Sequence, residues 1–556
     1  MAVLLAVGCS RDANPADPVT RALRPYVTPP GAPQHRVLVV GWDGATFNMI
    51  DPLLDEGRLP NLQKLINDGA QYELESTVIP VSSEAWVSAV TGVGPGKSGV
   101  FGFFGRAPGS YDLQLVSSRS RQFPAIWNIL GHYGRRTHVV SVPITYPPEN
   151  VLGVNFGCML APFDADYAYP PGLADTLRGL GFQPDLDAWR EARPITTERI
   201  EQDHAVRTDI LCSLAQHSAW DLLITNYKSL DVLSHRLYSG QTFGPIADHY
   251  VRLDDALGRL RAAAGPQTDV IVLSDHGFGL YTHQLSVHAL LAEIGVLKLK
   301  ADGGPLAADG SRPMSETFAA LQAEDLRRID MSQTTAYCDS TEGHFAALRL
   351  NLRGREPQGI VSPEERGAAA AELIDRLLAA RLPGSDQPVF VRAWRMEELY
   401  PGPAAADLPE ILLEADRRFL CRPYYVRPTA AKLPVPFPEH ERTGVLLAAG
   451  PSIRRGGRRE QASILDVTPT LLQLLGVPVW REMDGKVIGS LFREPPAIAW
   501  VDGATLGVRS AWVGGDIEPG TSSEDVMRRL QALGYVQTRT DDDEGNAQSR
   551  PSGGNP

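Results

Sequence analysis

The sequence predicts an α/β protein with a central, mostly parallel sheet flanked by helices. Two short runs, at residues 270–273 (VIVL) and 37–40 (VLVV), are apolar and mostly β-branched, which is typical of strands buried on both faces. An amphipathic helix is expected at residues 250–264, directly before the first of these runs. Both runs stop near an aspartate and a glycine. In open α/β sheets the loops at the carboxyl ends of strands carry the ligand site.

Length and composition describe an ordinary globular protein. A chain of 556 residues accommodates one enlarged α/β domain with insertions. Its 43% hydrophobic and 21% charged residues are typical of a soluble protein. The formal net charge of −13 argues against a broad basic surface, and therefore against a nucleic acid polymer as partner. A small anionic substrate remains compatible with this charge, because bound dications can reverse the local field.

We expect three parts along the chain: a leader-like segment with a linker at residues 1–35, a main domain at 36–500 and a C-terminal extension at 501–556. Irregular sequence marks insertions at about 157–220 and 285–345. A Gly-, Ala- and Asp-rich stretch at 301–313 is expected to be a mobile loop. Residues from about 538 onward are expected to be disordered.

The N-terminus suggests export. Residues 2–8 form an apolar run that is too short to span a bilayer, and Cys9 follows it directly. Residues 6–9 (AVGC) resemble a bacterial lipobox, in which the cysteine is acylated after signal cleavage. No Lys or Arg precedes the run, so the alternative is a frayed N-terminus with a chance cysteine. We expect an exported protein, periplasmic or anchored to the membrane as a lipoprotein through Cys9.

Four further cysteines leave two alternatives open. They are Cys158, Cys212, Cys338 and Cys421. An even set in an exported protein allows two disulfides in three connectivities, but the wide spacing shows no framework pattern. Buried free thiols are the other alternative.

Several acids, imidazoles and one hydroxyl stand at expected element boundaries. Asp43 follows the strand at 36–42, and a helical segment is expected at 47–69. Residues 81–92 predict an extended segment, a turn at Ser82 and a short helix closed by Gly92. A hydroxyl at a helix start is usually an N-cap, but it can also be a nucleophile whose phosphoryl target faces the helix dipole.

The second half of the chain adds metal-ligand types. Asp231 and His235 would share one face of a helix at i and i+4, so both could bind one metal ion. Asp275 and His276 follow the strand at 270–273, and His440 precedes a strand at 444–450. Taken singly, each of these residues has an ordinary structural explanation, such as a helix cap or a surface contact.

The order of the motifs carries more information than any one of them. They are residues 41–47 (GWDGATF), 59–62 (LPNL), 91–92 (TG), 231–235 (DVLSH), 274–277 (SDHG), 351–359 (NLRGREPQG) and 466–470 (DVTPT). Together with His440 they resemble the alkaline phosphatase superfamily, specifically its type I phosphodiesterase/nucleotide pyrophosphatase family. The resemblance covers about residues 36–490. It implies an alkaline-phosphatase-like sandwich with cap-like insertions.

The resemblance also implies a two-metal phosphohydrolase. One metal site would consist of Asp231, His235 and His440, and the other of Asp43, Asp275 and His276 with the hydroxyl of Ser82 bridging towards it. Aspartate and histidine ligands suit zinc, with manganese as the alternative. This branch places its nucleophile nine residues before the Thr-Gly pair, which is Ser82 here, with Ser83 as the alternative. The implied reaction passes through a phosphoseryl intermediate and acts on phosphodiesters or nucleotide-like pyrophosphates.

One departure affects substrate recognition. Nucleotide pyrophosphatases of this branch carry an Asn in the segment that corresponds to residues 99–103 (GVFGF), and this sequence has none there. Phosphoryl recognition would then come from elsewhere, with Arg106 and Lys97 as candidates. The alternatives are a sulfatase-like hydrolase, a phosphomonoesterase or phosphomutase, and an inactive metal-binding module. A sulfatase would need a Cys- or Ser-x-Pro-x-Arg motif, which residues 82–86 (SSEAW) lack.

Overall fold

The computed structural model describes residues 17–31, 35–158, 160–161, 165–184, 197–304, 318–382, 386–510 and 512. A nine-stranded sheet forms the centre of the larger lobe. Its strands are β1 (Arg36–Trp42), β2 (Gly69–Glu75), β5 (Thr137–Val140), β6 (Asn155–Phe156), β7 (Ala168–Tyr169), β8 (Leu222–Tyr227), β9 (Thr268–Leu273), β17 (Thr443–Ala449) and β18 (Glu460–Ser463). They lie in the order β18-β2-β17-β9-β1-β8-β5-β6-β7.

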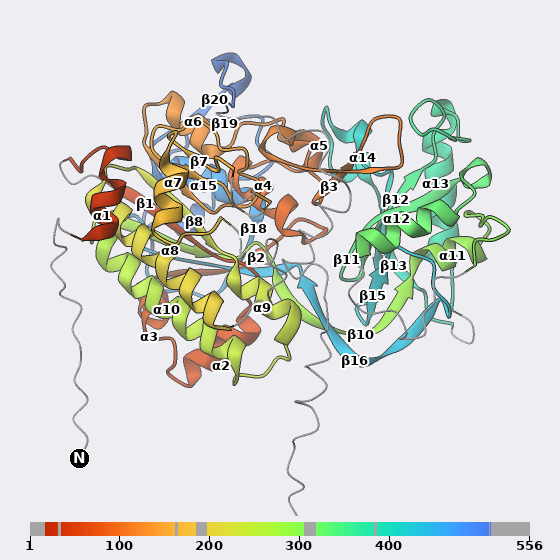
Figure 1. Cartoon of the computed structure of the whole chain (residues 1–556), viewed down its shortest axis with the longest axis horizontal. Helices are drawn as coiled ribbons and strands as arrows, with labels where there is room; N and C mark the ends of the chain where they lie inside the picture. Colours follow the sequence, from red (N-terminus) through yellow and green to blue (C-terminus); the bar gives the residue numbers. More distant parts are fainter. Residues whose placement is uncertain are drawn as a thin grey trace, which may run out of the picture.

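The middle of this sheet is parallel. β1 pairs with β8 and β9 in parallel, and β5 continues the parallel set beyond β8. β17 runs antiparallel to both β9 and β2. The two apolar runs therefore become neighbouring central strands, and the prediction of a mostly parallel sheet is confirmed (Figure 1).

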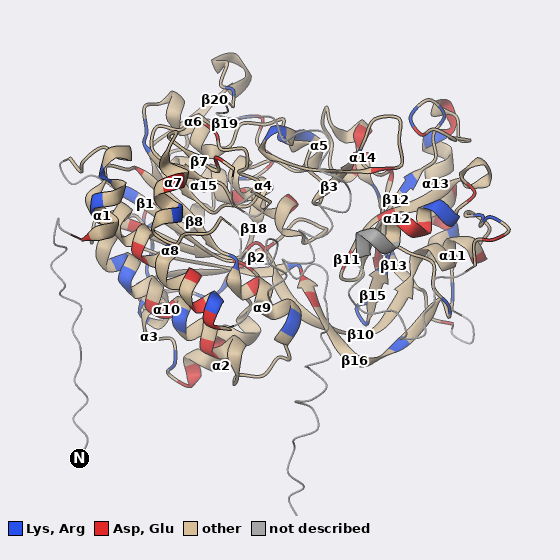
Figure 2. Ribbon diagram, viewed as in Figure 1, with Lys and Arg blue, Asp and Glu red and all other residues tan. Residues whose placement is uncertain are grey.

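Helices cover both faces of the sheet, because alternate side chains of its strands point to opposite sides. Leu38 and Val40 of β1 belong to one hydrophobic core, and Val37 and Val39 belong to the other. The helices over the first core include α2 (Phe47–Asp55), α3 (Pro60–Asn67), α8 (Thr197–His217) and α10 (Pro245–Ala264). Those over the second include α4 (Ser82–Thr91), α6 (Ile126–His132) and α15 (Val467–Leu474). Figure 2 shows acidic and basic residues interspersed along α8 and α10 rather than a continuous basic stretch.

A smaller lobe stands beside the main sheet, on the right in Figure 1. Three strands lead into it, β10 (Gly277–Ser286), β15 (Phe419–Arg422) and β16 (Ala430–Glu441). Its second sheet consists of β11 (Ala336–Glu342), β12 (Phe345–Leu350), β14 (Ile411–Ala415) and β13 (Phe390–Arg395), all antiparallel. Around its core lie α11 (Val287–Glu293), α12 (Phe318–Arg328) and α13 (Arg366–Ala379). These elements extend to Glu441, well past the insertion expected at 285–345.

The remaining elements are short. They are α1 (Pro18–Leu23), α5 (Pro95–Ser98), α7 (Leu173–Gly179), α9 (Ser229–Leu237), α14 (Met396–Leu399), β3 (Phe104–Arg106), β4 (Leu113–Leu115), β19 (Val479–Trp480) and β20 (Trp500–Val501). The helical segment expected at 47–69 is not one continuous helix in the structure. Gly57 adopts a left-handed conformation with φ +70° and Pro60 starts a new helix, so the segment breaks into α2 and α3.

Within the described residues no disulfide joins Cys158, Cys212, Cys338 and Cys421, so the disulfide alternative is wrong for pairings among these four. In the described part of the chain, every helix is either too short or too polar to serve as a membrane span. Cys9, most of the expected loop at 301–313 and the extension beyond residue 512 lie outside the described residues. Lipid attachment through Cys9 stays a prediction.

Candidate metal centre

The topology of the sheet gathers the sequence-predicted ligands. Asp43 follows β1, and Asp275 follows β9, its neighbour on one side. Asp231 and His235 lie on α9, which begins just after β8, the neighbour of β1 on the other side. Because β9, β1 and β8 are parallel, their carboxyl ends meet at one edge of the sheet. His440, near the end of β16, closes the group from the strand that pairs with β10.

The first group of ligand atoms is a compact triangle, and its three side chains are buried. Asp231 Oδ1 lies 3.3 Å from His235 Nε2 and 3.1 Å from His440 Nε2, and the two imidazole nitrogens are 2.9 Å apart. Ligands bound to a tetrahedral zinc at roughly 2.0–2.1 Å stand about 3.3 Å from each other. The spacing therefore fits one divalent ion.

The second group surrounds the hydroxyl of Ser82. Its Oγ lies 3.4 Å from Asp43 Oδ1 and 3.2 Å from His276 Nε2. The same imidazole nitrogen is 3.6 Å from Asp43 Oδ1 and 3.3 Å from Asp275 Oδ2. α4 begins at Ser82, as predicted, and Gly92 ends it in a left-handed conformation with φ +73°. The hydroxyl thus stands at a helix start and among the ligand atoms.

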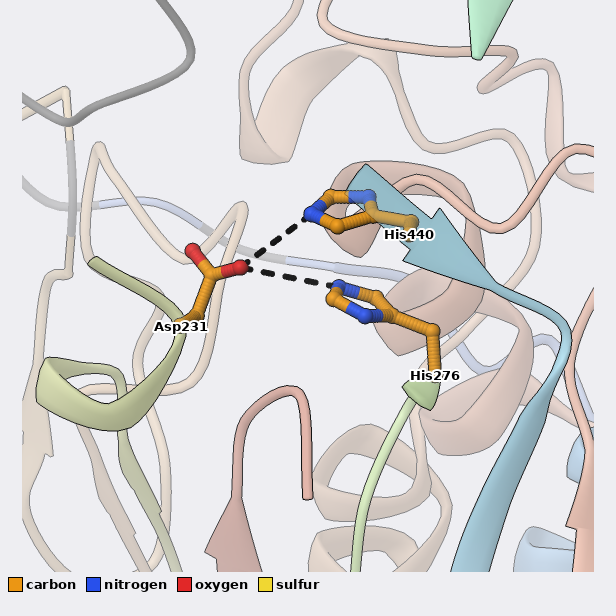
Figure 3. Close-up of side chains that lie close together, drawn as sticks. All are labelled: Asp231, His276 and His440. Atoms are coloured by element: carbon orange, nitrogen blue, oxygen red, sulfur yellow. Dashed lines mark hydrogen bonds and ion pairs between the residues drawn. The ribbon is translucent and has the colours of Figure 1, made fainter. Parts of the chain in front are cut away.

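The two groups adjoin each other. Figure 3 shows Asp231 Oδ1 facing both His440, at 3.1 Å, and His276, at 4.0 Å. The imidazole rings of His276 and His440 stack with centroids 3.7 Å apart. Asp231, His276 and His440 thus form a further three-residue group of potential ligands, beside the group of Asp43, Asp275 and His276. The clusters suggest divalent metal binding, while the division of the ligands between two ions stays a prediction.

The electrostatics of the site fit bound dications. Burial, together with the charges of Asp43 and Asp231, raises the pKa of Asp275 well above its ordinary value. Burial and Asp231 also raise the pKa of Asp43. Within the described residues, the buried Oδ2 of Asp275 accepts no hydrogen bond. Crowded, buried carboxylates with spare lone pairs are stabilised by a metal ion and disfavoured without one.

Asp43 is held by two donors on its far side. Trp86 Nε1 and Asn226 Nδ2 donate to Asp43 Oδ2 over 3.1 Å and 2.6 Å. Both donors engage this one oxygen, so Oδ1 is left to face Ser82 and His276. A carboxylate fixed in this way presents one oxygen to a metal ion.

We expect Gly41→Ala to disturb this arrangement. A Cβ at Gly41 would lie 2.5 Å from Cη2 of Trp86 and 2.7 Å from Oδ1 of Asn226. Both donors of Asp43 would have to move, so the free energy of unfolding should fall by about 1–3 kcal/mol and metal affinity should fall with it. Urea denaturation and metal titration measure these effects. Gly131→Ala is the control, because a Cβ there meets nothing within 4 Å; wild-type values for Gly41→Ala would contradict the prediction.

Sequence reasoning missed a cation in the site. Lys228 is buried, and its Nζ lies 3.4 Å from Asp231 Oδ2. Burial alone would raise the pKa of Asp231, but His235 and Lys228 hold it well below its ordinary value. Lys228 lies three positions before Asp231 in the chain, but no pattern in the sequence indicated that this lysine is buried.

Two glutamates were also missed. Glu342 Oε1 lies 3.1 Å from His440 Nδ1, and Glu439 Oε1 lies 3.5 Å from His235 Nδ1. Burial and the neighbouring Glu342 raise the pKa of Glu439 to about 7. Glu342 belongs to the smaller lobe, about a hundred residues before His440 in the chain, so its approach follows only from the tertiary structure.

Arg106, the predicted substrate-binding residue, lies in a salt bridge. Its Nε donates to Asp339 Oδ1 over 2.8 Å, and its Nη1 donates to the carbonyl oxygen of Tyr111 over 2.6 Å. It lines a cavity that none of the predicted ligands lines. Lys97 pairs with Asp484 over 2.5 Å. A role for Arg106 at the phosphoryl group stays a prediction.

A cavity of about 150 Å³ opens beside the ligands, between the two lobes. Its walls are mostly apolar and include Ile79, Val81, Phe101, Phe103, Phe104, Leu113 and Leu420. His235 and Glu439 line one end of it, and Val81 directly precedes Ser82. The cavity therefore reaches both the first ligand group and the neighbourhood of the serine hydroxyl.

Comparisons with known proteins find one family model and several solved structures that are similar to this chain. The family model described as type I phosphodiesterase/nucleotide pyrophosphatase matches residues 37–427. A comparison with curated proteins finds no match. Phosphonoacetate hydrolase from Sinorhizobium meliloti 1021, solved with phosphonoacetate, is 17% identical with a TM-score of 0.51, over 81% of this chain and 99% of that one. Human ectonucleotide pyrophosphatase/phosphodiesterase 5 is 14% identical with a TM-score of 0.49, over 83% and 100%.

The family match covers most of the larger lobe and much of the smaller lobe. The similarity to phosphonoacetate hydrolase supports the fold alone. The family resemblance inferred from the order of the motifs is confirmed, as is the assignment to hydrolases acting on phosphoric esters. The chain belongs to the type I phosphodiesterase/nucleotide pyrophosphatase family.

Proposed function

We propose that the protein is a two-metal phosphodiesterase whose nucleophile is Ser82. The observation that carries the proposal is the position of Ser82 Oγ, within 3.2–3.4 Å of two potential ligand atoms and at the start of α4. Asp231, His235 and His440 would hold one metal ion, and Asp43, Asp275 and His276 the other. When bound, such ions supply positive charge that lowers the pKa of the hydroxyl and neutralises the developing charge on the phosphoryl oxygens.

The residues of the chain position the reaction. Ser82 Oγ forms a bond to phosphorus while the bond to one alcohol breaks, and the proton of the serine hydroxyl leaves with that alcohol. The resulting phosphoseryl intermediate keeps the second ester group. The backbone N–H groups at the start of α4 face the anionic phosphoryl group. Water then displaces Ser82 from phosphorus, which releases a phosphomonoester and restores the hydroxyl.

The surroundings of the phosphoryl group favour a diester. Trp86, on the first turns of α4, is the donor to Asp43, and the helix supplies no cation after Ser82. Lys228 is a cation in the site that the sequence did not indicate, but it forms an ion pair with Asp231. A diester carries one charge fewer than a monoester and adds a second organic group, which the apolar cavity with Phe101 and Phe103 can accept.

Zinc is the proposed metal. The ligand groups combine imidazole nitrogens with carboxylate oxygens at separations that fit a small tetrahedral site. Manganese, which favours oxygen ligands, is the alternative. Restoration of the chelator-treated protein with each metal separately decides between them.

We expect a higher kcat/KM for methyl 4-nitrophenyl phosphate than for 4-nitrophenyl phosphate, because the monoester brings a second charge and α4 supplies no cation after Ser82 to offset it. The measurement uses one enzyme preparation with added zinc and then manganese. 4-Nitrophenyl sulfate is the third substrate and tests the sulfatase alternative. A monoester preference of about tenfold or more, equal to about 1.4 kcal/mol in the barrier, or a preference for the sulfate, would overturn the assignment.

A further inference from the structure

Two glutamates outside the predicted ligand set lie against the histidines of the Asp231 group, and one of them, Glu439, also groups with His235 and His440 as a potential metal ligand. Glu342 Oε1 is 3.1 Å from Nδ1 of His440, and Glu439 Oε1 is 3.5 Å from Nδ1 of His235. In both rings the opposite nitrogen, Nε2, faces Asp231 Oδ1, at 3.1 Å for His440 and 3.3 Å for His235. Each imidazole therefore lies between two carboxylates.

This geometry selects one tautomer of each ring. A neutral imidazole carries one proton, so a ring that donates from Nδ1 keeps its lone pair on Nε2. A carboxylate on the far nitrogen of a ligand histidine fixes the tautomer and the ring orientation, and it raises the basicity of the ligand nitrogen. The carbonyl oxygen of Pro80, 2.9 Å from His440 Nδ1, favours the same tautomer. Glu342 adds a negative charge that the carbonyl lacks.

The two glutamates come from different parts of the fold. Glu342 ends β11 in the smaller lobe, and Glu439 lies on β16, one residue before His440. Both line the apolar cavity. The side chain of Glu342 thereby connects β11 of the smaller lobe with His440, a predicted ligand on β16.

We propose that Glu342 and Glu439 are positioning residues that hold His440 and His235 ready to bind metal. The smaller lobe then sets the metal affinity of the Asp231 group, in addition to shaping the cavity. This inference rests on the proposed two-metal function. Neither glutamate has to touch the phosphoryl group. Both therefore act directly on metal affinity, and on turnover only through the bound metal.

Metal titration of the chelator-treated protein tests the proposal, by calorimetry with Zn²⁺ and by the visible absorption of the Co²⁺ form. Glu342→Ala should weaken one of the two sites about 10–100-fold and leave the other unchanged. Glu342→Gln keeps an acceptor for Nδ1, so its loss should be smaller. Glu414→Gln is the matched control, because Glu414 lies 3.7 Å from Nε2 of His344, a histidine of the same lobe that belongs to no predicted ligand group.

Wild-type affinity at both sites in folded Glu342→Ala, or equal weakening of both sites, would overturn the proposal. If this variant does not fold, Glu342→Gln and Glu439→Gln carry the test, and each should weaken one site selectively. The wild-type protein separates this inference from the function it rests on. Binding of two ions without phosphodiester hydrolysis removes the proposed function and leaves the positioning role standing, whereas a wild type that binds no dication removes both.

Discussion

Ser82→Ala should lower kcat for a phosphodiester by at least ~10³-fold while the protein folds and binds both metal ions. The reason is chemical: the variant lacks the oxygen that attacks phosphorus, but it keeps the other six proposed ligands. The hydroxyl is small and buried, so its removal leaves little empty space at the start of α4. Steady-state kinetics give kcat, and metal content with thermal unfolding shows that the site and the fold persist.

The neighbouring serine supplies the matched control. The Oγ of Ser83 is buried, and no hydrogen-bond partner for it exists among the described residues, whereas Oγ of Ser82 faces Asp43 and His276. Ser83→Ala should therefore retain most of the activity. Brief reaction with labelled substrate and acid quenching should trap label on the wild type and on Ser83→Ala, but not on Ser82→Ala. The reverse result would place the nucleophile one residue later.

The fold was predictable where local pattern and topology agree. The apolar runs predicted the buried parallel strands β1 and β9, and the helix expected at 250–264 and the start of α4 at Ser82 are confirmed. The break between α2 and α3 was missed because Gly57 and Pro60 stand within an otherwise continuous helical pattern. The extent of the smaller lobe was missed because antiparallel strands from distant segments, such as β10 and β16, pair without a local signal.

The residues of the site also fall into those that local sequence predicts and those that it does not. Ligand types at strand ends and at i and i+4 on a helix are local features, so Asp43, Asp231 and His235 could be proposed from the sequence. Lys228 and Glu342 could not, because a charged side chain is usually exposed and only packing turns it inward. The partners that orient ligands come from long-range contacts, which one sequence does not reveal.

Removal of the metal ions should abolish phosphodiester hydrolysis and also destabilise the protein. Three buried carboxylates, on Asp43, Asp231 and Asp275, repel one another when no dication offsets them. A ligand present at ~1,000 times its Kd stabilises the folded state by about 4 kcal/mol, so thermal unfolding should shift downward after chelation. Added zinc should restore both activity and the unfolding temperature. Full activity in metal-free protein would remove the two-metal mechanism.

Asp275→Asn separates the effect of metal binding on stability from the effect of repulsion between the buried carboxylates. The variant should lose occupancy of the site formed with Asp43 and His276 and should lose turnover. It also removes one of the repelling charges, so the metal-free variant should be at least as stable as the metal-free wild type, while its gain on adding zinc should be smaller. Asp254→Asn is the control, because Asp254 is a buried carboxylate that accepts hydrogen bonds from the backbone of α3, far in sequence from any proposed ligand set. Asp254→Asn should lose stability with and without zinc and should keep two metal ions. If Asp275→Asn behaves in the same way, Asp275 is a structural residue and not a metal ligand.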